Sequence, residues 1–179
     1  MSDMLTYLQT RSSIRRYTGE KIPREKLEKV LQAGLLSPSG RGRCPWEFIV
    51  VRDRNILREM TSCRTGAADM LGGADCAVVV IGDRTLSDTV VEDCSIAMSN
   101  MHNMAYSLGL GSCWIQGRNR QAADGRSTED FLRELLRFPE GYMLEAVLSL
   151  GIPAGRRGPR DLGSLNYSKI HDGVYGGKD

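Results

Sequence analysis

The chain has 179 residues, of which 41% are hydrophobic and 26% charged, an ordinary balance for one folded core. Its 24 basic and 22 acidic side chains leave a net charge of +2, too even for a nucleic-acid binder defined by its overall field. We expect one domain and no membrane span, because no stretch approaches about 20 apolar residues. The five cysteines form no Cys-x-x-Cys pair and residues 1–11 lack the apolar run of a signal peptide, so we expect free thiols, no metal site and a cytoplasmic location.

The first half of the chain is predicted to form helix 4–11, helix 23–37, strand 46–51, helix 55–71 and strand 74–81. Ser2 or Asp3 is expected to cap the first helix, and Pro23 to open the second. The apolar face of the second helix is expected to carry Leu27, Val30, Leu31 and Leu35. Gly66 is expected to break the third helix, and the apolar run 74–81 suits a strand buried on both faces.

The second half is predicted to form helix 90–108, strand 112–115, helix 128–138 and strand 143–150. Thr89 followed by Glu92 has the spacing of a capping box, and Gly109 is expected to end the long helix. The polar flank of that helix is thin, which places it at the centre of the molecule. Residues 151–179 are rich in Gly, Pro and Arg, and are predicted to be disordered or laid across a partner surface. The mixed order of helices and strands indicates an α+β fold.

The first candidate cluster is residues 11–16, Arg-Ser-Ser-Ile-Arg-Arg, at the end of the first predicted helix. Guanidinium groups beside hydroxyls suit a phosphate, because arginine offers forked donors and serine adds short hydrogen bonds. The alternative is a solvated basic turn in which cations favour the negative end of the helix dipole.

The second candidate cluster is the loop from Ser37 to Trp46, which contains two prolines and two glycines. Small residues let the backbone approach a ligand closely, and proline fixes the path of the chain. The alternative is an ordinary surface loop that leads into a strand.

The third candidate segment is residues 108–117, Leu-Gly-Leu-Gly-Ser-Cys-Trp-Ile-Gln-Gly. A dinucleotide fingerprint would need a strand before it, a helix after it and a glycine at position 114. Here a helix precedes, a strand follows, and Trp114 stands at that position, so a Rossmann nucleotide site is rejected.

Several side chains of the long helix could also carry chemistry. His102 is expected to be a satisfied core or edge histidine rather than a base, and Asp93 either a buried partner for a neighbour or a solvated group. Met98, Met101 and Met104 are expected to fill the core.

Taken together, these segments resemble the nitroreductase family. Residues 11–15 are similar to its N-terminal "RRSxR" signature, and the stretch from Ser37 to Val51 to its "APS…QPW.FIVV" segment. Residues 92–115 resemble its "D…A…LGLGscwi" helix and strand, and residues 151–154 its "GyPa" ending. Four motifs in the same order, covering nearly the whole chain, make the resemblance specific.

The resemblance implies an α+β fold with a central, mostly antiparallel sheet, built as an intertwined homodimer with FMN at the subunit interface. It also implies an oxidoreductase that takes hydride from NADH or NADPH and passes it through flavin N5 to small electrophiles, such as nitroaromatics or quinones, by a ping-pong mechanism. The implied cofactor-binding residues are Arg11, Ser12, Ser13, Arg15, Pro38, Ser39, Gly40, Gly42, Trp114, Ile115, Gln116, Gly117, Arg156 and Arg157.

Each group of these residues has an implied role. Arg11 and Ser13 would face the phosphate and ribityl chain, and Arg15 the N1/O2 edge of the flavin, as a cation that tunes it. The loop around Ser39 would come from the other subunit, residues 114–117 would offer backbone contacts near N5, and residues 156–157 would be a second phosphate anchor. No side chain is expected to be an obligate acid or base.

The chain also departs from the family pattern. Gly42 stands where the family often has an amide residue, and Cys44 where it has glutamine. Arg41 and Arg43 add charge that could favour an anionic substrate or the phosphate of NADPH, or could be solvated. Two rival functions therefore stay open: a specialised flavoenzyme acting on one metabolite (a dehydrogenase, a dehalogenase or a flavin-fragmenting enzyme), and a non-catalytic, flavin-binding regulatory dimer.

Overall fold

A computed structural model describes residues 4–177 of the chain, so the predicted cap at Ser2 or Asp3 lies outside the described residues. The chain divides into two compact units. The larger spans residues 13–156, and the smaller combines residues 1–12 with residues 157–179.

The larger unit is built on a four-stranded antiparallel sheet with the order β1-β2-β4-β3. Its strands are β1 (Trp46–Val51), β2 (Cys76–Asp83), β3 (Gly111–Gln116) and β4 (Tyr142–Gly151). Nearly every residue of the two central strands, β2 and β4, is buried, as expected for strands covered on both faces. The predicted α+β fold and antiparallel sheet are confirmed.

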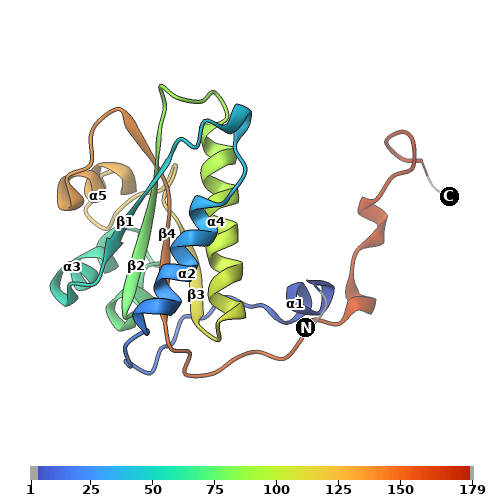
Figure 1. The fold of residues 1–179 in the computed structure, drawn as a ribbon, viewed down its shortest axis with the longest axis horizontal. Helices are drawn as coiled ribbons and strands as arrows, with labels where there is room; N and C mark the ends of the chain where they lie inside the picture. The colour runs from blue at the N-terminus through green and yellow to red at the C-terminus, as the bar shows by residue number, and fades with distance from the viewer. Residues whose placement is uncertain (1–3, 178–179) are drawn as a thin grey trace. The chain divides into compact units, whose positions relative to one another are not determined.

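Helices cover both faces of this sheet (Figure 1). The long helix α4 (Val90–Ser107) and α2 (Arg24–Leu35) pack on one face, where Val30, Met98 and Met101 are fully buried. The shorter helices α3 (Arg54–Glu59) and α5 (Thr128–Leu136) cover the other face. The predicted central position of the long helix is confirmed: it contacts α2 and all four strands. Gly109, with φ of +77°, follows its end.

Three local predictions are wrong. The segment 55–71 is not helical up to the expected break, because α3 already ends at Glu59 and a 3₁₀ turn follows; the break at Gly66 is itself confirmed, since its φ is +66°. Thr89 does not form a capping box with Glu92, since its hydroxyl donates to the Asp93 carboxylate, 3.2 Å away. Leu35 does not join the buried face of α2 and is 61% exposed.

The smaller unit contains α1 (Met4–Thr10) and two 3₁₀ turns at Leu162–Ser164 and Tyr167–Lys169. Gln9 and Arg160 join its two segments: the Gln9 side chain donates to the Arg160 carbonyl, 2.6 Å away, and the Arg160 N–H donates back to the Gln9 carbonyl. Its large apolar side chains stay exposed, namely Met4, Leu5, Leu8, Leu162, Leu165, Tyr167, Ile170, Val174 and Tyr175. None of the helices in residues 4–177 is long and apolar enough to cross a membrane.

Candidate functional site

The β3 edge of the sheet offers backbone groups that the sheet does not use. Within residues 4–177, β3 has a strand partner on one side only. On its other side the Ser112 carbonyl accepts a hydrogen bond from the Ile14 N–H, 2.9 Å away. Backbone groups alternate in direction along an antiparallel strand, so Trp114 and Gln116 also direct theirs away from β4. The backbone N–H of Gly117 points the other way, toward β4, and donates to the Glu145 carbonyl at 3.1 Å. The free edge therefore offers Trp114 and Gln116, while Ile115 is buried in the core.

A cavity of about 390 Å³ lies beside this edge. It brings together two residues predicted from the sequence, Arg15 and Trp114, although about 100 residues separate them in the chain. Arg64 and Asp69 also line it, so two guanidinium groups face one carboxylate. Among the described residues, neither Arg15 nor Arg64 belongs to an ion pair. The cavity therefore carries a net positive charge and suits an anionic or electron-rich ligand.

One wall of the cavity was not predicted from the sequence. It consists of Arg64, Gly66, Ala67, Asp69 and Met70, in the segment predicted to be helical. Backbone hydrogen bonds tie this segment to the chain beyond β3: the Thr65 N–H donates to the Gln121 carbonyl at 3.0 Å. The one available signal was Gly66, the expected helix breaker, since a break exposes backbone and redirects nearby side chains.

Cys113 lines the same cavity, next to Trp114. Burial raises the pKa of its thiol, against the opposing effects of the Arg15 charge and a hydrogen bond with Ser13. The thiol therefore stays protonated near neutral pH and is a poor nucleophile. The hydrogen bond places Ser13, another predicted cofactor residue, next to Cys113 at the cavity.

The second predicted cluster lies at the opposite edge of the sheet, before β1. The Gly40 N–H donates to the Asp93 carboxylate at 2.8 Å, and a Cβ added at Gly40 would collide with the Thr89 hydroxyl. The Cys44 N–H donates to the Ser39 hydroxyl, also at 2.8 Å. These contacts explain why small residues occupy the loop. Asp93 itself is buried and also accepts from Ser87, so the prediction of a buried partner is confirmed.

Two strands separate the two clusters. The loop of residues 38–44 leads into β1, whereas Arg15 and Trp114 lie at β3, on the other side of β2 and β4. Three interstrand spacings of about 4.8 Å place the two edges about 14 Å apart. One chain thus gathers Arg15, Ser13 and Trp114 but does not bring the loop residues to them.

The sequence profile of the nitroreductase family matches residues 8–62 and 59–152, most of the larger unit and part of the smaller. The chain belongs to the nitroreductase family. A relative from Archaeoglobus fulgidus, named as an NADH dehydrogenase/NAD(P)H nitroreductase, is 41% identical over 157 residues, 86% of this chain and 87% of its own. One with the same name from Methanothermobacter thermautotrophicus is 36% identical over 172 residues, 94% of this chain and 86% of its own.

Solved structures of nitroreductases have the same fold. The FMN-dependent nitroreductase from Clostridium difficile superposes with a TM-score of 0.92 at 40% identity, covering 96% of this chain and 99% of its own. A nitroreductase of Desulfovibrio desulfuricans, solved in complex with FMN, superposes with a TM-score of 0.73 at 26% identity, covering 93% and 96%.

Four predicted cofactor residues remain, namely Arg11, Ser12, Arg156 and Arg157. The guanidinium of Arg156 donates to the Leu110 carbonyl at 3.1 Å and lies over the Tyr106 ring, 4.7 Å from its centroid. Arg11, Ser12 and Arg157 belong to the smaller unit. Among the described residues, the buried hydroxyl oxygen of Ser12 finds no hydrogen-bond partner, which is unusual for a buried polar atom.

The side chains of the long helix act as expected in this nitroreductase fold. His102 is buried and its Nδ1 lies 2.6 Å from the Ser112 hydroxyl, so it is a satisfied core histidine. Met98 and Met101 are fully buried, and Met104 packs against the same cluster, which confirms their role as core filling.

Proposed function

We propose that this chain is an FMN-dependent oxidoreductase that takes hydride from NADH or NADPH and reduces small electrophiles such as nitroaromatics or quinones. The observation that carries the proposal is the positively charged cavity at the β3 edge, where Arg15, Trp114 and Ser13 meet. The names of the relatives, NAD(P)H nitroreductases, and the FMN of two structural neighbours support the same assignment.

The residues present fit FMN. The cavity offers two guanidinium groups that lack ion-pair partners among the described residues, and the outward-facing backbone groups of Trp114. Those of Gln116 lie two residues further along the same strand edge. The buried Ser12 hydroxyl, without a partner in the described part of the chain, has a donor to give a phosphate oxygen. We assign the phosphate and ribityl contacts to Arg11, Ser12 and Ser13, with Arg157 as a further phosphate anchor. Arg156 is a weaker candidate, because Leu110 and Tyr106 already hold its guanidinium.

FMN, when bound, supplies the hydride chemistry, so the chain needs no obligate acid or base. Arg15 supplies a fixed positive charge that stabilises negative charge on a reduced ligand more than a neutral oxidised one. Arg64, which lines the same cavity, adds to the same field. A single open cavity serves donor and acceptor in turn, which gives ping-pong kinetics.

A second copy of the chain completes the proposed site. The loop residues Pro38, Ser39, Gly40 and Gly42 lie at the β1 edge, about 14 Å from the β3 edge of their own chain. We therefore assign them to the cofactor of the partner. The smaller unit, with its exposed apolar side chains, is assigned to the partner's surface, because such side chains usually mark an interface.

The decisive test is the identity of the cofactor. The purified protein should be yellow, should release FMN and not FAD on denaturation, and should oxidise NADH or NADPH with a quinone as acceptor. FAD, or a colourless protein that cannot be reconstituted with FMN, would contradict the proposal. An FMN-loaded protein without turnover would instead support a regulatory flavin-binding dimer.

A further inference from the structure

Where β4 pairs with β2, the β4 strand contains one extra residue. In the pairing of β2 with β4, Val80 lies opposite Ala146 and the next residue, Ile81, lies opposite Leu144, so Glu145 is left over as a β-bulge. In a regular strand Met143 and Ala146, which are three residues apart, would point to opposite faces. Both instead pack in the cluster beneath α4. Bulges of this kind often lie next to functional sites, where they redirect a side chain.

The bulge directs the backbone carbonyl of Glu145 toward the end of β3. This carbonyl accepts hydrogen bonds from the N–H groups of Gly117 and Arg118, at 3.1 and 2.9 Å, and from the side-chain amide of Gln116 at 3.3 Å. One carbonyl therefore fixes three consecutive residues, at the point where the strand that borders the Arg15 cavity ends.

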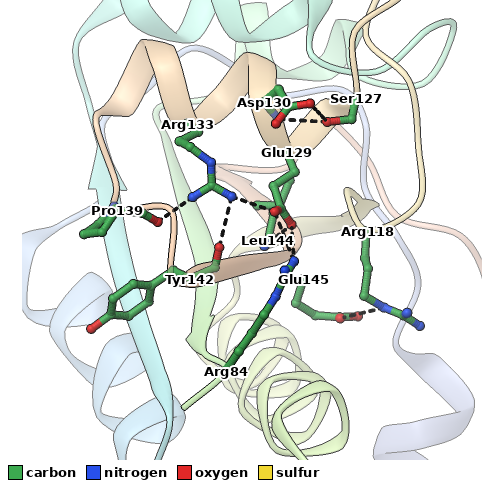
Figure 2. A network of polar contacts seen from close by, with 10 residues as sticks. All are labelled: Arg84, Arg118, Ser127, Glu129, Asp130, Arg133, Pro139, Tyr142, Leu144 and Glu145. Carbon is green, nitrogen blue, oxygen red and sulfur yellow. Dashed lines mark hydrogen bonds and ion pairs between the residues drawn. The ribbon is translucent and has the colours of Figure 1, made fainter. Parts of the chain in front are cut away.

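The carboxylate of Glu145 makes further contacts with the residues at the end of β3 and with α4. Its side chain is 4% exposed, and its Oε1 accepts from the Ser95 hydroxyl of α4 at 3.2 Å and from Gln116 Nε2 at 3.4 Å. Its Oε2 lies 3.4 Å from Nε of Arg118, the ion pair drawn in Figure 2. A carboxylate is costly to bury, and at Glu145 this cost is offset by the hydrogen bonds and the ion pair that tie it to α4 and to the end of β3.

The side chain of Gln116 links Glu145 to Trp114, because it hydrogen-bonds to both residues. The indole Nε1 of Trp114, which can only donate, lies 2.9 Å from Gln116 Oε1. The amide oxygen of Gln116 must therefore face Trp114, and its NH₂ group must face Glu145. The backbone groups of Trp114, at the cavity, and of Gln116, two residues further along the strand, both face outward, so Glu145 holds this part of the edge through one continuous chain of hydrogen bonds.

We propose that Glu145 is a positioning residue that holds the Trp114–Gln116 edge in the geometry needed for hydride transfer to and from the bound cofactor. This inference rests on the proposed function. Its structural counterpart is Glu129, which holds the neighbouring residue of the same strand. Glu129 accepts from the Leu144 N–H at 2.8 Å and pairs with Arg84 and Arg133 (Figure 2).

The test compares the FMN-loaded wild type with Glu145→Ala, Glu145→Gln and Gln116→Ala, and with Glu129→Gln as the matched control. Stopped-flow measurements give the rate of flavin reduction by NADH or NADPH, and titration gives FMN affinity. Glu145→Ala should slow reduction about 10- to 100-fold, since small misplacements of reacting groups have effects of this size. Glu145→Gln keeps an oxygen acceptor for Gln116 and Ser95, and should return to within about threefold of wild type.

Two further results separate positioning from general stability. Gln116→Ala should slow reduction as much as Glu145→Ala, and the double variant should be no slower than either, because both changes break one chain of contacts. Glu129→Gln should lower the melting temperature but keep the wild-type rate. If Glu145→Ala does not fold, Gln116→Ala, which leaves the core intact, carries the test.

The outcomes also distinguish this inference from the proposed function. A wild-type chain that takes up no FMN contradicts both. A wild type that binds FMN and is reduced normally, while Glu145→Ala or Gln116→Ala is reduced at the same rate, leaves the proposed function standing and overturns the positioning role. Additive slowing in the double variant, or a Glu145→Gln rate as low as that of Glu145→Ala, overturns it as well.

Discussion

At the β3 edge, residues from three separate parts of the chain converge on one cavity, and two arginines there lack ion-pair partners among the described residues. At the β1 edge, the loop of residues 38–44 is instead internally satisfied, with the Gly40 N–H held by Asp93 and the Cys44 N–H held by Ser39. The β3 edge therefore has charged side chains available to bind a ligand, whereas the loop at the β1 edge is already held in one conformation by its own hydrogen bonds. Two such edges complement each other when they belong to different copies of the chain.

Complementation between two defective chains tests this comparison with the largest expected effect. Arg15→Glu should abolish function at the β3 edge and Pro38→Glu, an exposed loop position, at the β1 edge. Each variant alone should be inactive. Co-expressed in equal amounts they should recover about a quarter of wild-type activity, because half of randomly paired dimers are mixed and each mixed dimer has one intact site. Quinone-dependent oxidation of NADH measures the recovery, and no recovery would place both edges in the site of one chain.

Charge placed on the smaller unit tests how the two copies are held together. Ile170 is 71% exposed in the chain, so Ile170→Asp should leave a folded monomer unaffected. If Ile170 packs on a partner, the lost burial should weaken the dimer by about 2 kcal/mol and lower FMN occupancy with it. Light scattering over a concentration series measures the dimer. Ser168→Asp adds the same single negative charge at an exposed position two residues away and is the control, and equal dimerisation of the two variants would exclude Ile170 from the interface.

Removal of the Arg15 charge tests the electrostatic part of the β3 edge. Arg15→Ala should still bind FMN, since the phosphate contacts lie elsewhere, but its flavin potential should fall. A loss of about 1.4 kcal/mol corresponds to about 30 mV for a two-electron couple, and NADH-dependent reduction should slow with it. Redox titration and stopped-flow reduction provide the measurement. Arg16→Ala, an exposed neighbour, should leave the potential unchanged; identical potentials for both variants would show that Arg15 is a surface charge.

Much of this comparison was accessible from the sequence. The strand Trp46–Val51 was predicted with its observed bounds, since a compact apolar run follows a proline, and Gly109 marked the end of α4. The resemblance to the family selected Arg15 and Trp114, which the fold brings together. Each of these signals is local in the sequence: an apolar run after a proline, a glycine after a helix, or a short family motif.

Three features could not be predicted because their causes are not local. The Arg64–Met70 wall is an irregular turn around Gly66 that leads into a 3₁₀ helix at Asp69, so it has no helical hydrophobic period, and long-range backbone bonds such as that from Thr65 to Gln121 position it. The contact between Asp93 and Gly40 joins a helix to a loop 53 residues away. The bulge at Glu145 changes the register by one residue within a strand that is apolar on both faces, where alternation gives no signal.

The smallest expected effect separates the two edges by the reactivity of their thiols. Cys44 is exposed in the β1-edge loop, whereas Cys113 is 2% exposed at the β3-edge cavity. Burial raises the pKa of Cys113, and it raises the pKa of Cys63, Cys76 and Cys94 to about 12, so these four thiols are protonated at pH 8. The thiolate is the reactive form, so iodoacetamide at pH 8 should label Cys44 first, and labelling of Cys113 should increase as the pH rises.

If the loop lies over the cofactor of the partner, saturation with FMN should slow labelling of Cys44 severalfold without changing this order. Mass spectrometry of the cysteine-containing peptides, with Cys44→Ser as the control, gives each rate. Faster labelling of Cys113 at pH 8 would contradict the buried, protonated thiol. A Cys44 rate that does not respond to FMN would place the β1-edge loop away from the cofactor, and the contribution of the second copy would then have to come from other residues.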